Sequence, residues 1–118
     1  MKINESNITI MVKDMDASIK FYESIGLVLK NRWDNHYAML ETTGITIGLH
    51  PTVGKTMTSP STSISIGFMI DDANDAKSIL EKNKIKYDYE EGKSGIYLHF
   101  HDLDGTILYF TQPKWKHE

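Results

Sequence analysis

The chain has 118 residues, about the length of one domain, and its 40% hydrophobic and 25% charged content is typical of a folded globular protein. The formal net charge is −3 and no basic stripe is present, which argues against a nucleic-acid partner. The absence of cysteine excludes disulfides and thiolate chemistry. The first residues lack the apolar core of a signal peptide, and no apolar run is long enough to span a membrane, so we expect a cytoplasmic protein.

The first half of the chain predicts one helix and four strands. Alternating apolar residues over 8–12 predict a strand, and helical spacing after Asp14 predicts a helix that Gly26 ends. Asp14 or Asp16 is expected to cap the start of this helix, because a short side-chain acceptor satisfies the free N–H groups of a first turn. Three further strands are predicted over 27–32, 37–41 and 45–50.

The second half of the chain repeats this pattern. Residues 66–72 match residues 8–14 without a gap, at an offset of 58 (66 minus 8). A second helix is expected to begin at Asp72 or Asn74 and to stop at Asn83-Lys84, and its three following strands are predicted over 86–89, 96–101 and 106–111. The repeat predicts tandem βαβββ modules within a single domain, with module 1 at about 1–51, a linker at 52–63, and module 2 at about 64–113.

The predicted strands have two chemically different faces, because successive side chains of a strand point to opposite sides. One face is aliphatic or Phe and is expected to pack on the helices. It comprises Ile8, Ile10, Val12, Ala38, Leu40, Ile45, Ile47, Leu49, Ile64, Ile66, Phe68, Ile70, Ile96, Leu98, Phe100, Leu108 and Phe110. The other face mixes small, hydroxyl, thioether, aromatic and titratable side chains. It comprises Asn7, Thr9, Met11, Tyr37, Met39, Glu41, Thr46, Gly48, His50, Ser65, Gly67, Met69, Tyr97, His99, His101, Ile107, Tyr109 and Thr111.

The mixed face indicates a concave, partly dry surface that receives a small molecule, because amphipathic aromatics and Met lie beside small residues. Two other interpretations stay open at this point. The same side chains could line an interface between subunits, or a wet groove that has no specific ligand.

Several motifs resemble the vicinal oxygen chelate superfamily, which includes glyoxalase I, bleomycin-resistance and fosfomycin-resistance proteins and extradiol dioxygenases. Residues 10–14, 18–22 and 25–27 are similar to the family's V-x-D…S-x-x-F-Y…L-G-L pattern, and residues 101–106 are similar to x-D-P-D-G-N with Leu103 in place of Pro. The resemblance covers nearly the whole chain. It implies an α+β fold in which tandem βαβββ modules form a half-open mixed β-barrel with helices outside, commonly as a homodimer with the ligand inside.

The resemblance also implies where metal ligands would lie. Carried over by position, they fall on Asn7, Gly48, Ser65 and Tyr109, where the family uses His, Gln or Glu. Gly48 has no side chain, and the other three offer no anionic or imidazole donor of the kind that holds Zn, Ni, Fe or Mn. We therefore expect no metal and no other cofactor.

A displaced metal site is the alternative. His50, His99 and His101 belong to the mixed face, and Glu41 could add a carboxylate. Such a set would support a metal-dependent lyase, isomerase or dioxygenase. The simpler interpretation is structural, with His50 at a strand end and His101 beside the turn at 102–105.

His99 is the candidate catalytic residue. It lies three residues before Asp102, where fosfomycin-type relatives place a substrate-contacting Tyr, and Tyr97 and Tyr109 share its face. An imidazole there could act as base, as acid or as a hydrogen-bond partner.

The sequence favours a metal-free protein that binds a small aromatic or cationic molecule, with an enzyme or a partner-binding module as the alternatives. Tyr37, Tyr97, Tyr109 and Trp33 would stack on the ligand, with Glu41 as counter-charge. The full expected ligand-binding set is Asn7, Tyr37, Glu41, His50, Ser65, Tyr97, His99 and Tyr109. Pairing of the modules within one chain or between two chains stays open, as does a role for Trp115 in closing the cavity or covering a dimer contact.

Overall fold

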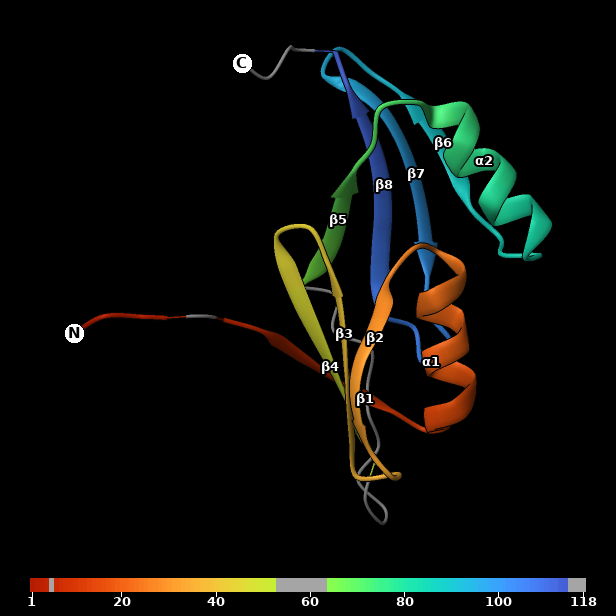
Figure 1. Cartoon of the computed structure of the whole chain (residues 1–118). Coiled ribbons are helices and arrows are strands. Elements are labelled where there is room, and N and C mark those ends of the chain that lie inside the picture. Colours follow the sequence, from red (N-terminus) through yellow and green to blue (C-terminus); the bar gives the residue numbers. More distant parts are fainter. Residues whose placement is uncertain (5, 53–63, 115–118) are drawn as a thin grey trace. The chain divides into compact units, whose positions relative to one another are not determined.

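A computed structural model describes residues 1–4, 6–52 and 64–114. The chain divides into two units, Met1–Ser59 and Pro60–Glu118, and the described part of each contains one four-stranded sheet and one helix (Figure 1). The boundary between the units falls in the predicted linker 52–63. Residues 53–63 of that linker and Trp115 lie outside the described residues.

Module 1 is a βαβββ unit. Its elements are β1 (Ile8–Val12), α1 (Met15–Ser24), β2 (Val28–Trp33), β3 (Tyr37–Thr42) and β4 (Ile45–Pro51). The strand order is β1-β4-β3-β2, with β1 parallel to β4 and the other pairs antiparallel. Helix α1 contacts β2, β3 and β4, so it covers one face of this sheet.

Module 2 has the same topology. Its elements are β5 (Ser65–Met69), α2 (Ala73–Lys82), β6 (Asp88–Glu91), β7 (Gly95–His101) and β8 (Ile107–Pro113). The order is β5-β8-β7-β6, with the parallel pair again at one edge, and α2 contacts β7 and β8. The α+β class and the tandem βαβββ modules are confirmed, whereas the barrel that would join the two sheets stays a prediction.

Both helices begin at an aspartate, as expected. Asp14 is the N-cap of α1, and its Oδ1 accepts the Ala17 N–H at 3.0 Å. Asp72 is the N-cap of α2, and its Oδ1 accepts the Asn74 N–H at 2.9 Å. The Ala73 N–H donates to Oε1 of Gln112 at 2.7 Å, which joins the start of α2 to β8.

Both helices also end in the same geometry, with different residues. Gly26 follows α1 with φ of +115°, and the next N–H, that of Leu27, donates back to the Tyr22 carbonyl at 3.0 Å. In module 2 the corresponding residue is Lys84, which has φ of +58° although it carries a side chain. The Ile85 N–H completes the same bond to the Leu80 carbonyl at 2.9 Å.

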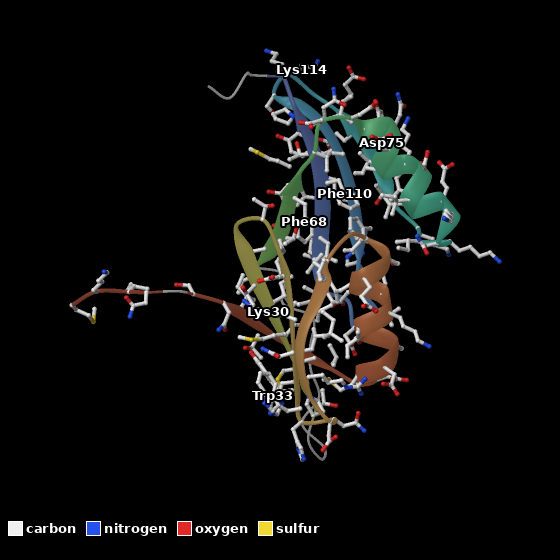
Figure 2. The ribbon with its side chains drawn as sticks, in the orientation of Figure 1. Lys30, Trp33, Phe68, Asp75, Phe110 and Lys114 are labelled. Atoms are coloured by element: carbon white, nitrogen blue, oxygen red, sulfur yellow. The ribbon has the colours of Figure 1, made fainter. Side chains whose placement is uncertain are left out.

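The core of each module lies between its sheet and its helix. Leu40, Leu49 and Tyr22 are fully buried in module 1, as are Leu98, Leu80 and Leu108 in module 2. Phe110 of β8 contacts Phe100 and Phe68, with ring centroids 5.2 and 5.9 Å apart, and Figure 2 labels Phe68 and Phe110 on their neighbouring strands. Most of the predicted aliphatic face is therefore confirmed as core.

Two members of that predicted aliphatic face are exposed, and Ile45, Phe68, Ile70 and Ile96 are only half-buried. Ile8 is 37% exposed and Ile64 is 56% exposed. Ile8 begins the edge strand β1, and Ile64 precedes the edge strand β5. Correct parity therefore did not bury them, because they lie at the beginning of edge strands, ahead of the residues of β1 and β5 that are buried, Ile10, Val12 and Ile66.

The β7–β8 turn is held by one carboxylate. Asp102 is buried, and its Oδ1 accepts the N–H groups of Asp104 at 2.9 Å and Thr106 at 2.7 Å. Gly105 has φ of +90°, and Leu103 is exposed. The predicted turn at 102–105 is confirmed, and Asp102 acts structurally within it.

The end of α2 provides a test of this fold. Lys84→Gly should raise the free energy of unfolding by about 0.5–1 kcal/mol, because glycine removes the Cβ contact that disfavours a left-handed backbone. Urea denaturation would measure the change. Lys82→Gly, two residues earlier and inside α2, is the matched control and should lower the same quantity by about 1 kcal/mol. A Lys84→Gly protein less stable than wild type would contradict the helix end described above.

Candidate functional site

Each sheet has a second face, opposite its helix, which we call the open face of that module. Its residues alternate along the strands with the core residues, so the mixed set predicted from the sequence lies here.

Three aromatic side chains form a cluster on the open face of module 2. Tyr97 and His99 of β7 stack with ring centroids 6.0 Å apart and 13° between their planes. Tyr109 of β8, the register partner of His99, lies 5.7 Å from His99 and 6.1 Å from Tyr97. All three are half-buried. The structure therefore brings together three of the predicted ligand-binding residues, with the candidate catalytic residue among them.

Gly67 allows Tyr109 to lie flat against the sheet. The two residues are register partners on β5 and β8, and a Cβ added to Gly67 would overlap the Cζ, Cε2 and Oη atoms of the Tyr109 ring. The Tyr97 ring is held through its hydroxyl, which lies 2.8 Å from Oγ of Ser94. The cluster thus presents ring faces and an imidazole edge, with two of the rings restrained by neighbours.

Tyr37 has a similar arrangement on the open face of module 1. Its hydroxyl lies where a Cβ of Gly48 would be, and it is 3.2 Å from Oγ1 of Thr9. On its other side, Trp33 of β2 lies 5.8 Å away between ring centroids and is half exposed. Tyr37 and Trp33 therefore form an aromatic pair on this face, and Trp33 is labelled in Figure 2.

The remaining predicted residues have local partners or stand apart. Nδ1 of His50 lies 2.8 Å from the Pro51 carbonyl oxygen, and the Glu41 carboxylate forms an exposed ion pair of 3.3 Å with Lys30. Asn7 precedes β1, Ser65 begins β5, and both are exposed. In the structure these residues do not form one cluster with the tyrosines of their own modules.

The four positions that the family resemblance implies for a metal do not fit one. Gly48 offers no donor, and the Tyr37 hydroxyl already occupies the place where a side chain at 48 would begin. The ring of Tyr109 lies over Gly67, and Asn7 and Ser65 contribute only an amide and a hydroxyl. Within residues 1–4, 6–52 and 64–114, no group of three His, Asp or Glu side chains is placed to hold a metal ion.

The sequence did not reveal which residues hold the aromatic side chains in place. Parity placed Thr9 and Gly67 on the mixed face but assigned them no role, and Gly48 was interpreted as a missing metal donor. No pattern in the sequence pointed to Ser94. A small residue beside a Tyr on a neighbouring strand is the signal that could have identified the two glycines.

Solved structures with the same fold include three informative ones. A glyoxalase/bleomycin resistance protein/dioxygenase domain from Frankia sp. EAN1pec has 21% identity and a TM-score of 0.75, covering 99% of this chain and 96% of its own. The fosfomycin resistance protein FosX from Listeria monocytogenes, complexed with Mn(II) and sulfate, has 17% identity and a TM-score of 0.78, covering 97% and 93%. A bleomycin-binding protein complexed with bleomycin has 18% identity and a TM-score of 0.72, covering 95% and 100%.

No curated protein matches the chain. Neither of the two helices in the described residues has the length and hydropathy needed to cross a membrane. A family model, described as Glyoxalase/Bleomycin resistance protein/Dioxygenase superfamily, matches residues 6–110. The matched segment spans both βαβββ modules, and the chain therefore belongs to this superfamily.

Proposed function

We propose that the protein binds a small planar aromatic molecule on its open faces, without a divalent metal. The observation that carries this proposal is the cluster of Tyr97, His99 and Tyr109, whose rings are half-buried and of which the two tyrosines are restrained by neighbours. Stacked or edge-to-face aromatic contacts each contribute about 0.5–1.5 kcal/mol beyond the area they bury. A flat ligand contacting two or three of these rings would bind specifically without coordination chemistry.

The relatives support a binding role of this kind. One structural neighbour is a bleomycin-binding protein that was solved with bleomycin, whereas FosX was solved with Mn(II). The positions where the family resemblance implies metal ligands carry neither His nor a carboxylate in this chain. Tyrosine side chains occupy the space there, because Tyr37 lies over Gly48 and Tyr109 lies over Gly67. In this proposal His99 is a ring and hydrogen-bonding contact for the ligand, and its action in proton transfer stays a prediction.

We also propose a homodimer, as the family resemblance implies, and a cytoplasmic location, as expected from the composition of the sequence. A chain without cysteine is compatible with a reducing compartment. Native mass spectrometry of the purified full chain would report the number of subunits together with any retained ligand.

Metal analysis tests the metal-free part of the proposal. Protein purified without chelators should contain Ni, Zn, Fe and Mn far below one ion per chain, because the four implied positions offer no His or carboxylate. Elemental analysis after native mass spectrometry is the measurement. A stoichiometric metal that disappears in His50→Ala or His99→Ala would overturn this part and favour the displaced histidine site.

Isothermal titration tests the binding itself. Metal-free bleomycin and indole-3-carboxamide serve as aromatic probes, and fosfomycin with Mn(II) serves as the metal-dependent counter-probe. Tyr109→Leu should weaken binding of the aromatic probes about tenfold, the loss of about 1.4 kcal/mol of stacking.

Tyr89→Leu is the matched control for that titration. Tyr89 lies on the helix side of the same sheet, where it is the register partner of Leu98 on β7. Nζ of Lys77 lies 4.3 Å from its ring centroid. Its substitution should leave affinity unchanged. No binding of either aromatic probe, or binding only with Mn(II), would refute the proposed function.

Gly67→Ala tests whether probe binding depends on the position of the Tyr109 ring, because this variant keeps the ring but displaces it. The added Cβ would force the Tyr109 ring to swing away from the sheet but meets no backbone atom among its nearest contacts, so the free energy of unfolding should change by less than about 1 kcal/mol. Probe affinity should nevertheless fall several-fold, because Tyr109 no longer lies flat. Gly92→Ala, where an added Cβ meets nothing within 4 Å, is the control. Equal affinities in the two variants would contradict the role of the flat ring.

A further inference from the structure

One buried hydroxyl in module 2 has no partner within the described part of the chain. Thr111 of β8 is 6% exposed, and no group in residues 1–4, 6–52 or 64–114 lies within hydrogen-bonding distance of its Oγ1. The backbone of Thr111 is satisfied, because its carbonyl accepts the Ile70 N–H at 2.9 Å. A buried hydroxyl without a partner costs free energy, and a valine of nearly the same shape would avoid that cost.

Thr111 lies on the open face beside the aromatic cluster. It alternates along β8 with the core residue Phe110 and shares its side of the strand with Tyr109. Its register partners are Tyr97 on β7 and Met69 on β5. The hydroxyl is therefore placed at the border of the surface that the proposed function assigns to a planar ligand.

The corresponding position in module 1 also carries a polar side chain. There Met11 of β1 pairs with His50 of β4, as Met69 of β5 pairs with Thr111 of β8. His50 finds a partner in the Pro51 carbonyl oxygen. His50 is thus engaged through Nδ1, whereas Oγ1 of Thr111, next to the Tyr97–His99–Tyr109 cluster, has no partner among the described residues.

We propose that Thr111 Oγ1 hydrogen-bonds the polar edge of the bound aromatic molecule, such as a carboxamide, a ring carbonyl or a ring N–H. This inference rests on the proposed function and specifies the ligand class as a planar ring with a hydrogen-bonding substituent. Such binding requires side chains next to Thr111, among them its register partner Met69, to shift, because the hydroxyl is buried in the free protein. Met69 is 57% exposed and its unbranched thioether side chain adapts easily.

Two probes with one ring system test the inference. Indole-3-carboxamide carries an amide where 3-methylindole carries a methyl group, and binding of each can be followed by titration calorimetry and by NMR shifts. Thr111→Val should weaken binding of indole-3-carboxamide about fivefold to tenfold, the loss expected for one hydrogen bond. Binding of 3-methylindole should be unchanged. Thr111→Ser, which keeps the hydroxyl, should bind the amide within about twofold of wild type.

The stability of the free protein gives a second, ligand-independent result. Thr111→Val should unfold at the same or a higher urea concentration than wild type, because it removes an unsatisfied group. A lower midpoint would mean that the hydroxyl is already bonded in the free protein, for example to a buried water, and would overturn the inference.

The binding results separate this inference from the proposed function. Equal weakening of both probes, or no weakening of either, would overturn the role of Thr111 while leaving aromatic binding intact. If wild-type protein binds neither probe, the proposed function fails, and the inference that rests on it fails too.

Discussion

Each four-stranded sheet in this protein has one helix to cover it, so only one of its two faces can be buried by that helix. The side-chain alternation of a strand then separates the residues into two sets with different fates. Leu40 and Leu98 on the helix side are fully buried, whereas Tyr37 and Tyr97, each an odd number of residues away, are half-buried on the open side. The helix caps, the tight β7–β8 turn and the core all maintain this separation.

The two modules fill their open faces by the same physical means with different residues. In each module the outer end of a tyrosine side chain lies over a glycine of a neighbouring strand, where no Cβ is in its way. In module 1 that glycine is Gly48 on β4, and in module 2 it is Gly67 on β5. The register pairs Thr9–Gly48 and Gly67–Tyr109 occupy equivalent places in the two sheets. Flat rings therefore occupy the places where relatives in the superfamily are expected to carry metal donors.

Proteins that share this fold can therefore differ in chemistry, because the chemistry depends on the side chains of the open face. The superfamily is shown by the match over residues 6–110, and solved structures with the same fold include one protein with Mn(II) and one with bleomycin. The planar ligand with a polar edge that we propose rests on the aromatic cluster and on the Thr111 hydroxyl, which has no partner among the described residues. The cluster depends on the register of the consecutive strands β7 and β8, whereas the surroundings of Thr111 also depend on the pairing of β8 with β5, which is far away in the sequence.

The sequence by itself determined the repeat, the βαβββ order, the capping aspartates and the division of the strands into two faces, because these depend on residues a few positions apart. It misplaced β6 by two residues, since Asp88–Glu91 is exposed throughout and has no apolar alternation to define its ends. It also predicted wrongly that Ile8 and Ile64 are buried, because the extent to which a helix covers an edge strand is decided by the tertiary structure. The contacts between Tyr109 and Gly67, between Tyr37 and Thr9, and around Thr111 were decided only by the tertiary structure, because strand register brings these residues together from distant parts of the chain.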